Sequence, residues 1–152
     1  MRNQTVTVTA QMLIRKPAAE VFQAFIDPAQ TINFWFTKSS GPLVEDGMVT
    51  WEWEMYQFAT EVWVKAIKPN EKITVVWGAG KTTIEFEFKA LTEDTTYVEI
   101  SNYGFTEQGE DLLPVVMDNM GGFTTVLDGL KAYLEHNIRL NLIADKFPPG
   151  NK

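Results

Sequence analysis

The sequence predicts an α+β fold in which one long helix packs against an antiparallel sheet, and three observations predict it. Apolar and polar residues alternate with a period of two in several segments between Thr5 and Tyr103, as in strands with one buried face. Short turns containing Gly, Pro, Asn or Asp separate these segments. Beyond them, apolar residues recur at steps of three and four from Val116 to Ile138, which makes roughly six turns of one amphipathic helix.

The N-terminal segment predicts one strand followed by two short helices. Residues 5–14 alternate Thr and Gln with apolar side chains, as a half-buried strand does. Pro17 suits the first turn of a helix, and apolar residues then follow at helical spacing over residues 21–26. Asp27-Pro28 ends this helix. A second short helix is expected over residues 28–35, packed on the sheet by its apolar side chains.

The middle of the chain predicts an antiparallel meander. Five alternating segments cover residues 49–55, 58–67, 73–77, 84–89 and 97–103. Together with the first strand they give a sheet of about six strands. An acidic loop over residues 104–111 leads into the long helix, which is long enough to cross the whole sheet.

The chain of 152 residues is long enough for one domain with a proper core. We expect this domain to span residues 1–145. Residues 146–152 contain two prolines and a glycine, and we expect a flexible tail there. The first residues show no targeting signal, and no apolar run is long enough to cross a bilayer. The sequence therefore predicts a cytoplasmic protein without a membrane span.

Composition excludes several classes of function. The absence of cysteine excludes disulfides, thiolate catalysis and Cys-ligated metals. The single histidine, His136, excludes a site with several histidine ligands within one chain. A net charge of −7 without a basic patch disfavours binding to nucleic acid. We therefore expect no metal, no cofactor and no nucleic-acid partner.

Three groups of residues along the chain carry a family resemblance. Around the first helices they are Pro17, Val21, Phe22, Asp27, Pro28 and Trp35. In the sheet they are Val64, Ile67, Pro69, Lys72, Ile73, Trp77, Thr96, Val98, Ile100, Asn102, Gly104 and Phe105. The closing helix contributes the stretch from Gly122 to Leu134. In this order they resemble the START-like (SRPBCC, helix-grip) superfamily, and more narrowly the family similar to the activator of the heat-shock protein 90 ATPase.

The resemblance implies a curved sheet that grips the C-terminal helix, with an apolar cavity between them. Members of the superfamily include ligand carriers, polyketide cyclases or aromatases, and domains that bind a chaperone. Two positions depart from the family pattern: Asn102 stands where many members have His, and Phe123 where many have Trp. Any function that depends on that His is therefore not expected in this chain.

The alternation of the strands predicts which side chains line such a cavity. On the concave face of the sheet we expect Trp51, Trp53, Phe58, Val62, Trp77, Phe86 and Asn102. The helix would turn Met120, Phe123 and Leu127 toward them, and Trp35 with Phe36 would form the mouth. The alternative is that these rings simply fill the core. Indole N–H groups and amides need partners when buried, and Asn102, Thr60 and Thr82 could orient a ligand.

Other constellations are interpreted as structural. His136 points about 200° away from the apolar stripe of the helix, and the pairs Glu52/Glu54 and Glu85/Glu87 lie on the outer face of the sheet. Gly80-Lys81-Thr82 lacks the earlier glycine and the following helix of a phosphate-binding loop. Outward-facing aromatic residues suggest a surface for a possible homodimer if they cluster; they are Trp63, Tyr97 and Tyr103.

The leading hypothesis is a domain that binds a hydrophobic small molecule, apolar or aromatic, in the cavity without a catalytic residue. The first alternative is a polyketide cyclase-like or aromatase-like enzyme that positions its substrate through Asn102. The second alternative, which comes from the resemblance, is an interaction domain that activates the ATPase of a chaperone.

Overall fold

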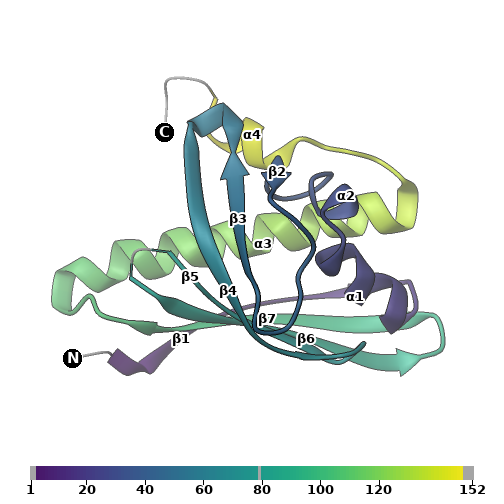
Figure 1. Ribbon diagram of the computed structural model, residues 1–152, viewed down its shortest axis with the longest axis horizontal. Coiled ribbons are helices and arrows are strands. Elements are labelled where there is room, and N and C mark those ends of the chain that lie inside the picture. Colours follow the sequence, from purple (N-terminus) through teal and green to yellow (C-terminus); the bar gives the residue numbers. More distant parts are fainter. Residues whose placement is uncertain (1–2, 79, 149–152) are drawn as a thin grey trace.

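Within residues 3–78 and 80–148, which the computed structural model describes, seven antiparallel strands form one curved open sheet (Figure 1). The strands are β1 (Asn3–Ile14), β2 (Lys38–Ser39), β3 (Met48–Trp53), β4 (Phe58–Lys68), β5 (Lys72–Trp77), β6 (Thr82–Thr92) and β7 (Thr95–Phe105). Their order in the sheet is β1-β7-β6-β5-β4-β3-β2. The meander expected from the sequence is therefore confirmed, with the first strand added at its far edge beside β7.

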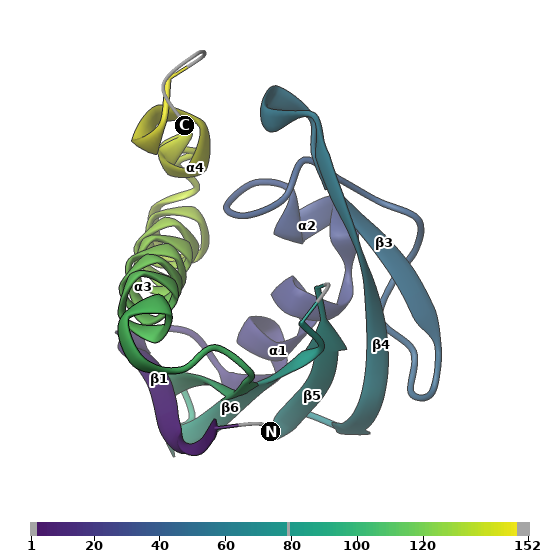
Figure 2. The same cartoon turned by 90° about the vertical axis from the view of Figure 1, so that its left-hand side faces the viewer.

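Helices occupy the connections and the C-terminal part. They are α1 (Ala18–Ile26), α2 (Pro28–Thr31), η1 (Glu54–Tyr56), η2 (Gly109–Asp111), α3 (Leu112–His136) and α4 (Leu142–Lys146). In Figure 2, α3 and α4 lie on the left, and the sheet curves from β1 beneath α3 to β4 and β3, which rise on the right. The fold is thus the predicted one, a curved sheet around a long helix with short helices after the first strand.

The sheet and the helices α2 and α3 differ in extent from the sequence expectation. The sheet has one strand more than the six expected, because β2 is only two residues long and too short to show a period. The helix α2 ends at Thr31 instead of near Trp35. Helix α3 begins at Leu112, four residues before the first apolar position that the stripe indicated.

Local hydrogen bonds explain why α2 is short. The carboxylate of Asp27 accepts a hydrogen bond from the backbone N–H of Ala29 at 3.0 Å and so caps the start of α2. The buried hydroxyl of Thr31 donates to the carbonyl of Ala24 at 2.6 Å, which ties the end of α2 to α1. The chain then turns, and Trp35 and Phe36 enter the core.

Helix α4 was not expected, and it lies over the end of the sheet. The backbone adopts positive φ angles of 53° at Asn137 and 59° at Asn141, which end α3 and lead into α4. The hydroxyl of Tyr56 in η1 donates to the carbonyl of Ile143 at 2.5 Å. The flexible tail expected over residues 146–152 begins at the last residue of α4, and residues 149–152 lie outside the described part.

The core lies between the sheet, α1 and the C-terminal half of α3. Its buried side chains form one continuous cluster that runs from β1 to α3. Gly129 brings α3 close to the segment after α2, since a Cβ there would lie 3.2 Å from Cβ of Phe34. In the described ranges, no helix has both the length and the apolar character that crossing a membrane requires.

Candidate functional site

A pocket of about 350 Å³ lies between the concave face of the sheet and the N-terminal half of α3. Its lining residues are Trp35, Trp53, Tyr56, Phe58, Trp77, Asp118, Asn119, Gly122, Phe123, Ile143, Lys146 and Phe147. Most come from β3–β5 and from α3 and α4, which face each other in Figure 2; Trp35 follows α2, Tyr56 belongs to η1 and Phe147 follows α4. Aromatic rings make up most of its wall.

The wall is a connected set of aromatic contacts. The centroid of the Trp77 ring lies 5.9 Å from that of Phe123 and 6.3 Å from that of Trp53. Trp53 continues to Phe58 at 5.8 Å. Trp35, at the inner end, lies 6.1 Å from Trp77. These separations fall within the range of about 4.5–7 Å for favourable aromatic pairs, so the rings support one another as a preformed surface.

The structure divides the residues predicted to line the cavity into three sets. The first set lines the pocket and contains Trp35, Trp53, Phe58, Trp77 and Phe123. The second set is fully buried behind the wall and contains Trp51, Val62, Phe86 and Leu127. The third set consists of Met120, which is 45% exposed and not part of the lining, and Asn102, which lies under the pocket.

Trp35 and Phe36 lie deeper than the mouth that the sequence suggested. Both rings are buried, and Phe36 stacks on Trp51 with ring centroids 4.9 Å apart. The indole Nε1 of Trp51 is buried and has no hydrogen-bond partner among the described residues. The outer end of the pocket wall is instead Phe58, whose surface is 56% exposed.

Asn102 is buried and forms three hydrogen bonds within the protein. Its Nδ2 donates to Oγ1 of Thr82 at 3.1 Å and to the carbonyl of Thr83 at 2.9 Å. Its Oδ1 accepts from Nδ2 of Asn119 at 2.9 Å. Both N–H groups and the carbonyl oxygen of this amide are therefore engaged, and Asn119 lies between Asn102 and the pocket.

Sequence reasoning missed the pocket residues that come from η1, α4 and the polar side of α3. Tyr56, Ile143, Lys146 and Phe147 belong to elements or a tail with no periodic signal. Asn119, however, lies four residues before Phe123 in the same helix, and this spacing places both on one face. Helical spacing could therefore have identified Asn119.

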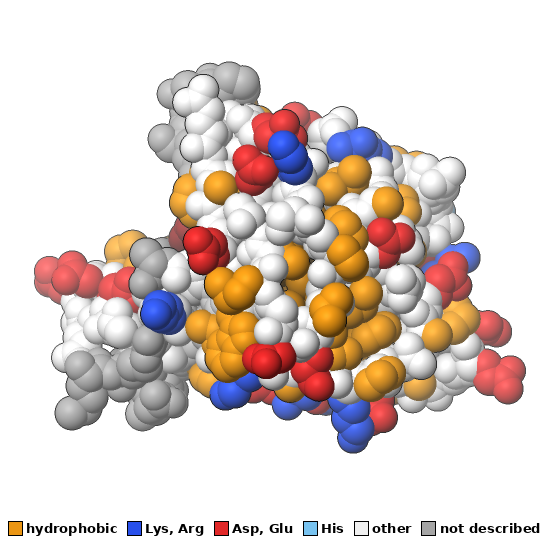
Figure 3. All heavy atoms as spheres, in the orientation of Figure 1, with side chains coloured by type: hydrophobic (Ala, Val, Ile, Leu, Met, Phe, Trp, Pro, Cys, Tyr) orange, Lys and Arg blue, Asp and Glu red, His pale blue; other side chains and the backbone are white. Residues whose placement is uncertain are grey.

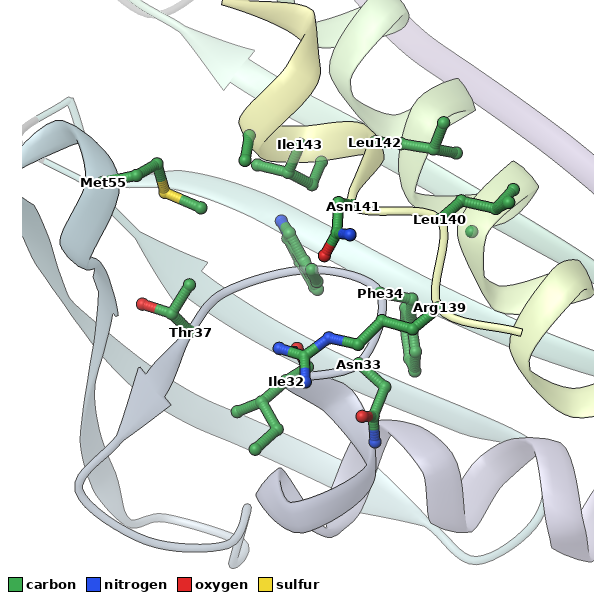
Figure 4. Close-up of a pocket in the computed structure, with 13 residues that line it drawn as sticks. Ile32, Asn33, Phe34, Thr37, Met55, Arg139, Leu140, Asn141, Leu142 and Ile143 are labelled. Carbon is green, nitrogen blue, oxygen red and sulfur yellow. The ribbon is translucent and has the colours of Figure 1, made fainter. Parts of the chain in front are cut away.

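A second, smaller pocket of about 50 Å³ lies between the turn after α2 and the segment that joins α3 to α4. Figure 4 shows Arg139 extending across it toward Ile32, where its Nη2 donates to the carbonyl of Ile32 at 3.2 Å. This volume is well below the range of about 300–1,000 Å³ for small-molecule sites. The contact therefore holds the α3–α4 connection in place.

The carboxylate pair on β6 has a structural role on the outer face. Glu85 accepts hydrogen bonds from Tyr103 and from Lys72, the latter at 2.5 Å. Burial acts to raise the pKa of Glu85, but the hydrogen bonds from Lys72 and Tyr103 outweigh it and hold the pKa below its usual value. The hydrogen bond to Glu85, together with burial, raises the pKa of Tyr103 to about 12. These groups stabilise one another across three strands.

The outward-facing aromatic residues do not form one cluster. Trp63 on β4 pairs with Val76 on β5, and Tyr103 on β7 pairs with Thr83 on β6, so two strands separate the two rings. Tyr97 lies at the other end of β7, opposite Lys89. His136 is exposed at the end of α3, as expected. In the part of the chain that the structure describes, no three His, Asp or Glu side chains are grouped as metal ligands would be.

Comparison with known proteins agrees with this architecture. Residues 15–135 match the family described as "Activator of Hsp90 ATPase homolog 1-like protein". The chain matches no protein among the curated proteins.

Several solved structures share the fold. Protein SSP2350 from Staphylococcus saprophyticus is 24% identical, with a TM-score of 0.77 and coverage of 89% of this chain and 96% of that one. Aha1 from Colwellia psychrerythraea, described as a dimer in solution, is 16% identical, with a TM-score of 0.72 and coverage of 87% and 98%. DynU16, a protein of the dynemicin biosynthetic locus, is 16% identical, with a TM-score of 0.75; the match covers 88% of this chain and only 48% of DynU16.

At these identities the solved structures establish a shared fold and leave function to be argued from the site. The family match extends from the end of β1 to the end of α3, and so includes every strand of the meander and most of the pocket wall. It confirms the resemblance found in the sequence. The chain belongs to the activator of Hsp90 ATPase homolog 1-like family.

Proposed function

We propose that this protein binds a small apolar or aromatic molecule in the pocket between the sheet and α3. The carrying observation is the pocket itself, about 350 Å³ with a wall formed largely of aromatic rings. Small-molecule sites have volumes of about 300–1,000 Å³ and are lined mainly by apolar side chains with a few polar groups. The polar groups here are few and lie along α3 and at the rim, and they include Asp118, Asn119 and Lys146.

The exposure of the wall supports this proposal. Phe58 is 56% exposed and Trp77 is only partly buried, although both lie on the concave face and pack against Trp53. Covering apolar surface stabilises a complex by roughly 25 cal/mol per Å². A flat aromatic molecule placed against these rings would therefore gain contact without displacing the side chains that already fill the core.

Gly122 offers a direct test, because it lines the pocket and a Cβ added there would meet no atom within 4 Å. The variant Gly122→Leu therefore places its side chain in the empty volume. Leucine also has a higher helix propensity than glycine, so this variant is expected to remain folded. Binding of 2-methoxynaphthalene, followed by NMR shifts of the indole N–H groups of Trp53 and Trp77, should weaken roughly tenfold or more.

Thr124→Leu is the matched control, since Thr124 is exposed on the same helix two residues away. It adds the same apolar side chain outside the pocket and should leave the affinity for 2-methoxynaphthalene unchanged. Unaltered binding in Gly122→Leu, or shifts confined to residues outside the pocket, would show that this pocket is not the binding site.

A second proposal concerns self-association through the outer face of β3 and β4. Met48 and Trp63 are paired in the β3–β4 register and are 58% and 36% exposed. Figure 3 shows hydrophobic side chains in the middle of the face that carries β4 and α1, with most charged side chains toward its edges. Sedimentation at increasing concentration should reveal a homodimer that Met48→Glu disrupts. A wild-type chain that sediments as a monomer at every concentration would rule the proposal out.

A further inference from the structure

A chain of hydrogen bonds runs from β6 to the pocket and has a fixed polarity. It begins at the backbone carbonyl of Thr83, which can only accept a hydrogen bond. Nδ2 of Asn102 must therefore face this carbonyl, at 2.9 Å, and its second N–H reaches Oγ1 of Thr82. The orientation of the Asn102 amide follows, and its Oδ1 faces α3.

The polarity passes from Asn102 to Asn119. Because Oδ1 of Asn102 can only accept, the atom of Asn119 that lies 2.9 Å away must be the donor Nδ2. The carbonyl oxygen of Asn119 is then on the side of the amide that is turned away from Asn102. Asn119 lines the pocket, and its Oδ1 receives no hydrogen bond from the residues that the structure describes.

The other polar groups of the pocket differ from Oδ1 of Asn119 in their partners and in their position. The hydroxyl of Tyr56 is already donated to the carbonyl of Ile143. Asp118 is exposed to solvent. The ammonium of Lys146 lies over Gly121, 5.8 Å from the centroid of the Phe147 ring. Asn119 is therefore the polar side chain that is both held in place by a buried residue and one helical turn from the aromatic ring of Phe123.

We propose that the pocket selects an aromatic ligand that carries a hydroxyl or N–H group, and that Oδ1 of Asn119 accepts a hydrogen bond from that group. Asn102 is a positioning residue in this arrangement, because it fixes which end of the Asn119 amide faces the ligand. The inference rests on the proposed function and adds the chemical class of the ligand.

Two probes that differ in one donor test it. Calorimetry should show that 2-naphthol binds the wild-type protein about twofold to tenfold more tightly than 2-methoxynaphthalene, since one net hydrogen bond is worth that ratio. In Asn119→Leu the two affinities should become equal. Asp128→Ala, on the exposed face of the same helix and outside the pocket lining, is the control and should keep the wild-type ratio. Asn119→Ala replaces the leucine variant if the latter does not fold.

The positioning role of Asn102 has its own test. In Asn102→Leu the Asn119 amide keeps its acceptor but loses the partner that orients it, so the ratio of the two affinities should fall toward one. A purely structural role would weaken both probes together and leave the ratio unchanged. Thr82→Val, which removes one of the bonds that hold Asn102, should lower the ratio by a smaller factor.

The outcomes separate this inference from the proposed function. If neither probe binds, the proposed function fails and this inference fails with it. If both probes bind wild-type protein with equal affinity, or Asn119→Leu keeps the preference for 2-naphthol, the proposed function stands and this inference is wrong. Loss of the preference in Asp118→Ala alone would assign the acceptor to Asp118 instead.

Discussion

The amide of Asn102 is engaged entirely by its neighbours, although the sequence placed it among the ligand contacts. Strand alternation correctly turns this side chain to the concave face, where it is fully buried. Alternation along one strand carries no information about what satisfies a buried amide. The answer depends on Thr82, Thr83 and Asn119, which reach Asn102 from a neighbouring strand and from α3. Burial could be predicted, and the partner could not.

The hydrogen bond between Asn119 and Asn102 predicts an effect on stability. Asn119→Ala leaves Oδ1 of Asn102 buried without its donor, and an unsatisfied buried polar atom costs about 1–3 kcal/mol. Urea denaturation should show a loss of that size in the free energy of unfolding. Asp118→Ala, one residue away and exposed, should change it by no more than about 0.5 kcal/mol. Equal stability of the two variants would mean that the bond between the amides contributes nothing.

At the scale of elements, the long periodic segments were predictable and the short ones were not. The strands of the meander and α3 show many repeats of one period, so their type follows from pattern alone. The two residues of β2 and the five of α4 are too short to show a period. These short elements are held by contacts across the fold, such as the bond from Tyr56 to Ile143. The part of the pocket lining that α4 supplies could therefore not be predicted from the sequence.

Two glycines of α3 predict opposite effects of the same substitution. At Gly122 an added Cβ meets nothing within 4 Å, so Gly122→Ala should stabilise the protein by about 0.5–1 kcal/mol through helix propensity. At Gly129 it would lie 3.2 Å from Cβ and 3.3 Å from the backbone oxygen of Phe34. Overpacking of this kind costs about 1–3 kcal/mol, so Gly129→Ala should be net destabilising. Thermal unfolding compares the two variants. A change of the same sign in both unfolding midpoints would contradict the close approach at Gly129.

The bond between Tyr56 and Ile143 predicts the dynamics of α4. Tyr56→Phe removes the hydroxyl that holds the α4 backbone to η1. Hydrogen exchange in the segment from Leu142 to Lys146 should become faster, while the global free energy of unfolding falls by no more than about 1.5 kcal/mol. Tyr97→Phe is the control, because Tyr97 lies on the outer face of β7 opposite Lys89 and lines neither pocket beside α4. Unchanged exchange in α4 would show that other contacts hold this helix.

At the scale of the whole molecule, the sequence predicted the architecture and one wall of the pocket. Parity places Trp51, Trp53 and Trp77 on the same face of the sheet. Strand alternation does not determine how far each of these side chains lies below the surface. That depends on the curvature of the sheet and on the position of Trp35. As a result Trp51 is buried behind Trp35, at a centroid distance of 4.8 Å, while Trp53 and Trp77 reach the pocket. The pocket is a property of the assembled sheet and helices rather than of any one segment.

Charge gives a prediction that also belongs to the whole molecule, because two effects of acidification oppose each other. The chain carries a net charge of −7 at pH 7, and protonation of carboxylates relieves the mutual repulsion. Protonation of two other carboxylates, those of Glu85 and Glu135, lowers the stability of the fold instead. Burial acts to raise the pKa of Glu85 and of Glu135, but hydrogen bonds from Lys72 and Tyr103, and from Lys131 and Arg15, outweigh it and lower both values. Their contribution to stability is complete above the unfolded value of 4.5 and is lost as the pH falls through the lowered values.

The double variant Glu85→Gln/Glu135→Gln separates these two effects. It should be less stable than the wild type at pH 7, because the hydrogen bonds and ion pairs that link β5 to β7 and β1 to α3 are weakened. On acidification below 4.5 the wild type should lose stability, whereas the double variant should lose less or gain some, since only the relief of repulsion remains. Urea denaturation across this range measures both slopes, with Glu52→Gln/Glu87→Gln as a control of equal charge. Parallel slopes for the wild type and the double variant would place the acid-sensitive groups elsewhere in the molecule.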